Sequence, residues 1–240
     1  MLLLDTPPPV CTPQVIVLAS GKGGCGRTTT ALALAASWRD AGHRVALLDL
    51  DPQAGATLAA GVRPPADPVR SHPVEVHGFR LWPAGRALAA AAATQLSDRL
   101  SAARRGADVV IADLSPALTD AGHAAAVPAA DLVAVVARLD AAGLPHVEEV
   151  VDYARAHSRP WRIVPTFRAG TRLSGEAETF LRGRFDSRVT QAVVPTDARA
   201  AEAPSRRAPV TDTARRARVT VAVRALADEL LGVAPSEVSR

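Results

Sequence analysis

A glycine-rich stretch near the start of the chain contains the only lysine of the sequence. Residues 20–30 read SGKGGCGRTTT, so three glycines lie between Lys22 and Arg27. The other 27 basic residues are arginine. The single lysine therefore indicates that position 22 requires a compact ammonium group rather than a planar guanidinium. Backbone N–H groups in such a turn can converge on a phosphate. The stretch therefore predicts a site for a phosphate-bearing ligand.

Two apolar runs and a helix must position this loop. Residues 14–19 (QVIVLA) and 44–50 (RVALLDL) are typical of buried parallel strands. Residues from 28 onward predict a helix that stops at Gly42. Strand, loop, helix and strand make a βαβ unit with a right-handed crossover. The loop would then precede a helix N-terminus, whose partial positive charge favours anions.

The rest of the chain continues this alternation. Residues 61–73 are proline-rich and predict a surface excursion, and residues 74–82 predict a strand pair or one broken strand. Further strands are predicted at 107–114, 131–137, 161–165 and 191–194, and further helices at 86–105, 144–157, 171–183 and 211–231. We therefore expect a single doubly wound α/β domain over 14–232, with a mostly parallel central sheet flanked by helices. Residues 1–13 and 233–240 are expected to be flexible tails.

Composition narrows the class of protein. Hydrophobic residues make up 48% of the 240 positions but aromatic residues only 3%, which argues against an aromatic platform for stacking nucleic-acid bases. The net charge of +4 and the pI of about 10.0 permit weak binding to polyanions without establishing it. Two cysteines, Cys11 and Cys25, lack metal-ligand spacing, and no apolar run reaches the length of a membrane span. We expect a cytoplasmic protein.

Threonines and acids at the right places extend the phosphate chemistry. Thr28 closes the loop, where its hydroxyl can ligate Mg²⁺, and Thr29 can bond an α-phosphate oxygen. Asp51 and Asp113 follow or end two predicted strands whose carboxyl ends should meet at one sheet edge. Asp51 could instead cap the helix that follows it, and Asp113 could simply be a solvated strand end. Together these residues predict a nucleotide site with Mg²⁺.

Four segments carry a resemblance to one family. Residues 22–28 (KGGCGRT) resemble the deviant Walker A motif, KGGxGK[ST], of the ParA/MinD ATPases, which are P-loop NTPases. Residues 47–53 (LLDLDPQ) resemble that family's Walker A′ segment, and residues 109–113 (VVIAD) its Walker B strand. Residues 202–205 (EAPS), with Pro209 and Val210, resemble the EAPSxxxP element of ParA partition ATPases. The matching segments follow one another in the family's order, and the region that they span is nearly the whole chain.

The resemblance implies a role for each matching residue. Lys22 would reach across a dimer interface to the partner subunit's phosphates, and Asp51 would orient the attacking water. Asp113, and Asp51 as well, would hold Mg²⁺ through water, beside the Thr28 hydroxyl. Contacts to ATP are implied for Gly23, Gly24, Cys25, Gly26, Arg27, Thr28 and Thr29.

Two departures from the family pattern matter. Arg27 stands where the family has the lysine that contacts the β- and γ-phosphates of its own subunit, so we expect weak hydrolysis. A nucleotide-gated binding module with little turnover is the alternative. Pro165 and Thr166 stand at the place where related enzymes often carry an asparagine for the adenine. We therefore expect the base to meet backbone groups around Pro195, Thr196 and Asp197.

The resemblance also implies what the nucleotide controls. ParA-type ATPases form ATP-dependent homodimers that bind DNA non-specifically, on the nucleoid, and they work with a separate centromere-binding, ParB-like partner. Salt-sensitive contacts to DNA phosphates are predicted for six arginines of the last third of the chain. They are Arg199, Arg206, Arg207, Arg215, Arg216 and Arg218. A MinD-like membrane ATPase would need a basic amphipathic C-terminus, which residues 230–240 do not provide, so no membrane binding is expected.

Overall fold

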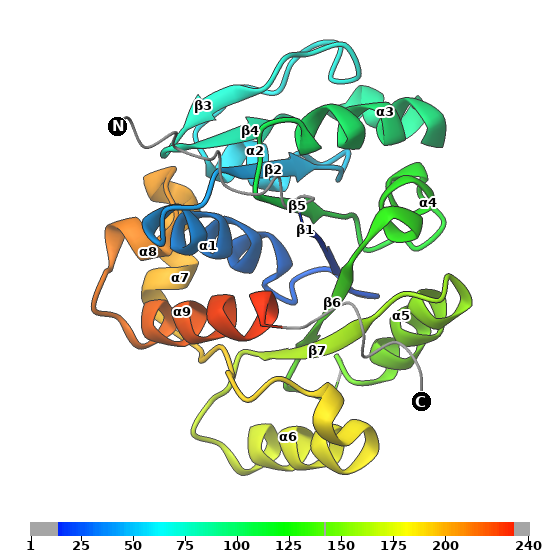
Figure 1. Ribbon diagram of the computed structural model, residues 1–240. Helices are drawn as coiled ribbons and strands as arrows, with labels where there is room; N and C mark the ends of the chain where they lie inside the picture. The colour runs from blue at the N-terminus through cyan, green and yellow to red at the C-terminus, as the bar shows by residue number, and fades with distance from the viewer. Residues whose placement is uncertain (1–13, 142, 233–240) are drawn as a thin grey trace, which may run out of the picture.

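Short β-branched and leucine-rich runs form the strands of one central sheet. In the computed structural model, which describes residues 14–141 and 143–232, seven strands are ordered β3-β4-β2-β5-β1-β6-β7 (Figure 1). Only β3 is antiparallel to its neighbour, which confirms the predicted mostly parallel sheet. The strands are β1 Gln14–Ala19, β2 Val45–Asp49, β3 Val74–Val76, β4 Phe79–Trp82, β5 Val109–Asp113, β6 Leu132–Arg138 and β7 Trp161–Thr166. The two predicted tails lie outside the described residues.

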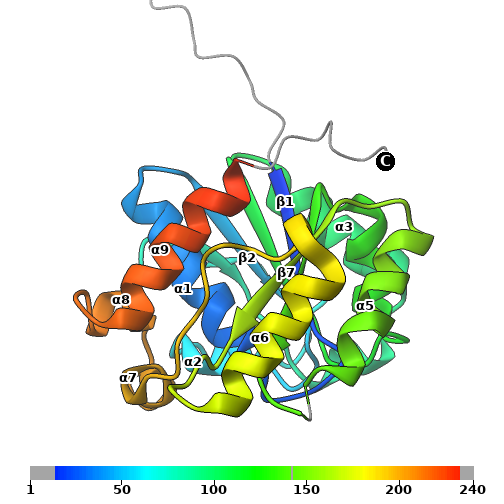
Figure 2. The same cartoon turned by 90° about the horizontal axis from the view of Figure 1, so that it is seen from below.

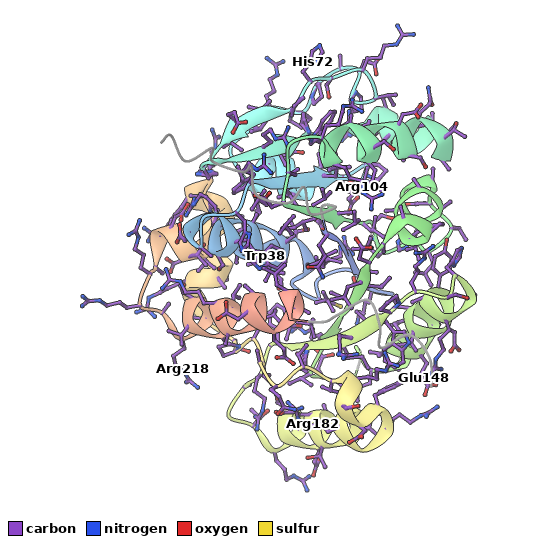
Figure 3. The ribbon with its side chains drawn as sticks, in the orientation of Figure 1. Trp38, His72, Arg104, Glu148, Arg182 and Arg218 are labelled. Carbon is purple, nitrogen blue, oxygen red and sulfur yellow. The ribbon has the colours of Figure 1, made fainter. Side chains whose placement is uncertain are left out.

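Helices cover both faces of the sheet, as the alternating pattern predicted (Figures 1 and 2). One layer contains α1 Arg27–Asp40, α2 Gly55–Ala59, α7 Ala198–Glu202, α8 Val210–Thr213 and α9 Arg218–Leu231. The other contains α3 Ala93–Arg104, α4 Ala121–Ala126, α5 Pro145–Ala156 and α6 Arg172–Phe185. Trp38 of α1 is fully buried, and its indole N–H donates to the Ala227 carbonyl of α9 at 3.1 Å (Figure 3). This bond ties the first and last helices together.

The order of the strands brings three carboxyl ends to one edge of the sheet. β1 lies between β5 and β6, and β5 lies between β1 and β2. Leu18 of β1 pairs with Asp113 of β5, and Asp113 pairs in turn with Asp49 of β2. Since these strands are parallel, the loops that follow them emerge side by side, where ligands bind in open α/β sheets.

The chain over residues 74–82 forms a strand pair rather than one broken strand. β3 and β4 meet at a tight turn in which His77 and Gly78 both have positive φ, of 49° and 73°. The predicted continuous helix over 86–105 is wrong. A 3₁₀ turn, η1 Arg86–Ala90, ends first, and the α3 helix begins only at Ala93. Gln95 causes this new start, because its side-chain oxygen accepts the Ala92 N–H at 2.9 Å.

The predicted strand over residues 191–194 is also wrong. The N–H groups of Gln191 and Ala192 donate to the Glu229 carboxylate at 2.9 and 3.0 Å, so they are not available to a ladder with β7. Isolated bridges flank the segment instead, between Ile163 and Val189 and between Arg168 and Pro195.

The predicted helix over 211–231 is interrupted between α8 and α9. The Ala214 carbonyl accepts the Ala217 N–H at 2.9 Å and the Thr220 hydroxyl at 2.8 Å, and this local bonding replaces a helical turn. Among the described residues, the structure contains no helix with the length and apolar character needed to cross a bilayer.

Candidate functional site

The glycine-rich loop connects the end of β1 to the first turn of α1. Gly24 and Gly26 have φ of 76° and 78°, a left-handed conformation that favours glycine. A Cβ on Gly26 would also lie 3.0 Å from the Phe167 ring. No side chain caps the N-terminus of α1, so its first N–H groups remain able to bind an anion. The loop therefore has the backbone geometry that the phosphate prediction requires.

Arg27 points into the sheet edge rather than towards the loop's outer side. Its Nε donates to Asp113 at 2.9 Å, one terminal N–H group donates to Asp51 at 3.2 Å, and the other donates to the Ser20 hydroxyl at 2.8 Å. Arg27 is 7% exposed, Asp51 8% and Asp113 0%. The guanidinium thus lies between the two acids for which we predicted a role in holding Mg²⁺.

The side-chain oxygens of the two acids and of Thr28 lie together. The Thr28 hydroxyl donates to the second oxygen of Asp113 at 2.8 Å. Asp51 also accepts the Gln53 N–H at 2.8 Å, but Ala54 is the N-cap of α2 and no side chain caps this helix, so the alternative role of Asp51 as a helix cap is wrong. Carboxylate and hydroxyl oxygens fit Mg²⁺, which is bound through one or two carboxylates plus phosphates and water. No group of three or more His, Cys, Asp and Glu side chains suited to a metal occurs in the described ranges.

Asp49 is a further buried acid of this edge, and the sequence analysis assigned it no role. Its carboxylate accepts the N–H and the hydroxyl of Thr57 at 2.8 and 2.7 Å and the N–H of Asp51 at 3.2 Å. Burial, and then the charge of Asp113, raise the pKa of Asp49 to about 7. Burial likewise raises the pKa of Asp113, against the opposing effect of Arg27. Asp49 therefore fixes the backbone that carries Asp51.

Lys22 lies half-buried within the loop. Its backbone carbonyl accepts hydrogen bonds from the Ser20 hydroxyl at 3.0 Å and from the Cys25 thiol at 3.2 Å. Burial raises the pKa of the Cys25 thiol. Cys25 is thus a structural member of the loop, and the proposed reach of Lys22 to a second subunit stays a prediction.

A cavity of about 330 Å³ opens beside the first turns of α1. Its wall contains the predicted base-contacting residues Pro195, Thr196 and Asp197, together with Thr29 and an unexpected residue, Phe167. The structure therefore brings these predicted residues together at the end of the phosphate loop. Their contact with a base stays a prediction.

Arg138 and Phe167 shape the cavity's edge, and neither was predicted from the sequence. The Arg138 guanidinium lies 4.1 Å from the centre of the Phe167 ring and donates to the Gly24 carbonyl at 3.1 Å. The Thr166 hydroxyl lies 2.8 Å from the Cys25 carbonyl, which it uses as an acceptor. The only sequence feature that points to Arg138 is its position at the end of β6, the strand next to β1. No local pattern points to Phe167.

The six predicted DNA-contacting arginines are all exposed, and they come from α7, α9 and the segments between them. Arg199 and Arg206 lie near acids, at 3.7 Å from Asp197 and 3.2 Å from Glu202. The other four have no acidic partner among the described residues; they are Arg207, Arg215, Arg216 and Arg218. DNA binding by this surface stays a prediction.

This chain is similar in sequence to known proteins. Residues 16–210 match the family described as the CobQ/CobB/MinD/ParA nucleotide binding domain. The chromosome-partitioning ATPase Soj of Thermus thermophilus is 37% identical over 212 residues, which cover 79% of this chain and 84% of Soj. The chromosome partitioning protein ParA of Myxococcus xanthus is 26% identical, covering 80% of this chain and 78% of that protein.

Solved structures agree on the fold. The cell division ATPase MinD of Pyrococcus furiosus superimposes with a TM-score of 0.78 at 19% identity, covering 92% of this chain and 99% of MinD. The cobyrinic acid a,c-diamide synthase of Mycobacterium smegmatis, solved with an ATP analog and magnesium, gives 0.77 at 23% identity, covering 91% and 94%. The predicted P-loop architecture is confirmed.

Proposed function

This chain belongs to the family of CobQ/CobB/MinD/ParA nucleotide-binding domains, and from that premise we propose that it is a ParA-type partition ATPase. It binds ATP with Mg²⁺, dimerises around the nucleotide, binds DNA non-specifically as the dimer, and hydrolyses ATP slowly. One observation carries the proposal. The phosphate loop, Asp51 and Asp113 converge at one sheet edge in a chain 37% identical to Soj.

Each residue of the edge has a part in the proposed reaction. The loop N–H groups and the N-terminus of α1 hold the phosphates, and Asp51 orients the attacking water. Thr28 and Asp113 would hold Mg²⁺, which would supply neutralisation of the charge on the terminal phosphates. Lys22 of each subunit contacts the phosphates held by the other. Phosphoryl transfer depends on this positioning and charge neutralisation rather than on a covalent intermediate.

Arg27 is the reason to expect slow turnover. Its guanidinium is held by both acids that the reaction uses, so it must release them before they can act on metal and water. The same observation favours a second candidate function, a nucleotide-gated binding module with almost no hydrolysis. In that case nucleotide exchange, rather than turnover, would end the DNA-bound state.

The proposed DNA surface is the set of six arginines from α7 to the start of α9. Four of them have no acidic partner within residues 14–141 and 143–232, and these can release counterions from DNA at little cost to the ion pairs described there. The proposed partner is a separate ParB-like protein that stimulates hydrolysis. We place the working protein on the nucleoid because the proposed dimer binds DNA non-specifically.

The decisive experiment is the oligomeric state with nucleotide. Light scattering on a sizing column should show a dimer with Mg²⁺ and a non-hydrolysable ATP analogue, and a monomer without them. Lys22→Ala should bind the analogue but remain monomeric. A wild-type chain that stays monomeric at saturating analogue would refute the proposal.

The second experiment measures DNA binding against salt. Replacing Arg206 and Arg207 together with alanine should lower the slope of log affinity on log salt by about two while the dimer persists. ATP turnover with DNA, and then with added partner protein, separates the ATPase from the nucleotide-gated module.

A further inference from the structure

The side chain of Arg27 lies between the two proposed metal ligands. It contacts Asp113 from Nε at 2.9 Å and Asp51 from a terminal nitrogen at 3.2 Å. Side-chain exposure is 8% for Arg27, 11% for Asp51 and 0% for Asp113. The contacts are therefore buried ion pairs and not surface pairs that solvent would screen.

The shape of guanidinium explains how one side chain serves three acceptors. Arginine carries donors on three nitrogens in a fixed plane, and here they reach Asp113, Asp51 and the Ser20 hydroxyl. A lysine has only one nitrogen to share among the same acceptors. The three acceptors come from or follow β1, β2 and β5, so Arg27 links all three strand ends at this edge.

Arg27 provides the counter-charge for buried acids at this edge of the sheet. Asp49, Asp51 and Asp113 are at most 8% exposed, and Arg27 is the cation that contacts two of them. Removing the guanidinium would leave a buried cluster of carboxylates without this counter-charge. Such a cluster with the Thr28 hydroxyl beside it would attract a divalent cation by itself.

We infer that Arg27 is a tethered counter-cation that excludes free divalent metal from the nucleotide-free site and yields its place only when metal and nucleotide arrive together. The inference rests on the proposed nucleotide site. Free Mg²⁺ must displace a guanidinium that is held by two carboxylates, and Mg²⁺ also loses its own water reluctantly. A nucleotide changes the balance, since its phosphates offer the guanidinium bidentate contacts in exchange for the acids. Metal and nucleotide then bind interdependently.

The test measures metal binding to the nucleotide-free protein, with Mn²⁺ as a paramagnetic probe read by electron paramagnetic resonance. The variants are Arg27→Gln, which keeps length without charge, and Arg27→Lys, which keeps charge on one nitrogen. We expect free Mn²⁺ to bind Arg27→Gln at least about tenfold more tightly than wild type, with Arg27→Lys between them. Melting temperatures with Mg²⁺ alone, against NaCl of equal ionic strength, should rise in the same order.

Arg138→Ala is the matched control. Arg138 also lies against the loop, through the Gly24 carbonyl, but it does not contact Asp51 or Asp113. Its loss removes a positive charge from the loop's surroundings, and the Mn²⁺ affinity should remain that of wild type. Equal Mn²⁺ affinity in wild type and Arg27→Gln would overturn the inference, as would a gain in Arg138→Ala equal to that in Arg27→Gln.

Adding a fluorescent ATP analogue to the same series separates this inference from the proposed function. Wild type should bind Mn²⁺ tightly only when the analogue is present. If wild type binds the analogue with metal and also binds free Mn²⁺ as tightly as Arg27→Gln, the counter-cation role fails and the nucleotide site stands. If wild type binds no analogue with metal present, the proposed function itself fails.

Discussion

Thr57→Val should destabilise the protein because Thr57 completes the hydrogen bonding of buried Asp49. The Thr57 hydroxyl donates to Asp49 at 2.7 Å and accepts the Ala84 N–H at 2.8 Å, and all three residues are fully buried. Valine has the same shape but makes neither bond. A hydrogen bond is worth about 0.5–1.5 kcal/mol to a neutral group and about 1.5–3 kcal/mol to a charged one, and Asp49, with its pKa raised to about 7, takes both forms near neutral pH. An orphaned buried N–H costs about 1–3 kcal/mol. Since such terms are not additive, we expect a loss of about 2–4 kcal/mol.

The assay is urea unfolding of wild type, Thr57→Val and Thr57→Ser. Serine keeps the hydroxyl and loses one methyl group, which costs about 1 kcal/mol. The valine variant therefore reports the loss of the hydroxyl at constant shape, and the serine variant reports the loss of the methyl group. If the valine variant were within about 0.5 kcal/mol of wild type, and so more stable than the serine variant, the hydroxyl would contribute nothing at this site. The assignment of Asp49 and Thr57 as the support of the Asp51 segment would then be refuted.

Three further predictions concern other parts of the molecule. In a Cys11→Ser background, Cys25 should react with iodoacetamide at least about tenfold more slowly in the native protein than in urea, because burial raises its pKa; equal rates would contradict this. Hydrogen bonds from Arg44 hold the pKa of Asp108 at about 2, so their stabilisation is present above pH 4 and is lost as the pH falls from about 4 to 2. Urea unfolding should show a small loss over this window that Asp108→Asn lacks, and an identical loss in the variant would refute it. Phe167→Ala should weaken binding of a fluorescent ATP analogue by about tenfold, or 1.4 kcal/mol, and unchanged affinity would remove Phe167 from the base site.

Local pattern was enough to predict most of the sheet. The strands at 14–19, 107–114 and 161–165 each have an apolar centre, which suits strands buried on both faces. Their order in the sheet could not be read from the pattern, because any of these runs could have paired with any other. The predicted strand at 191–194 failed for a tertiary reason. Glu229, nearly forty residues away, takes the N–H groups that a ladder would need.

Helices without a clear stop signal were the least predictable. Alanine favours helix at every position, so an alanine-rich segment such as 86–105 carries no periodic stripe to fix where a helix begins. The interruption before Ala93 depends on one side chain, Gln95. The break after α8 depends similarly on the Thr220 hydroxyl, which bonds the Ala214 carbonyl. In both cases one polar side chain decided against a uniform helical propensity.

Some residues of the candidate site could be predicted from local sequence, and others could not. The loop and the acids at positions 51 and 113 follow strands directly, so residue type and place along the chain sufficed to bring them together. Arg138 contacts Gly24 and Phe167, which lie in distant segments, and no local pattern marks such contacts. Asp49 acts through Thr57, eight residues further along the chain.

The arginine at position 27 now has a physical basis beyond the arginine-rich composition of the chain. Drift from lysine to arginine would require only that the site tolerate a larger group. Here, instead, three acceptors from separate strand ends match the three nitrogens of one planar fork, in a place almost closed to solvent. A lysine could not satisfy all three, whereas at position 22 the same composition has left the chain's only lysine. The two positions of one loop thus follow opposite demands, a compact ammonium in the loop and a branched guanidinium among the acids, and composition alone explains neither.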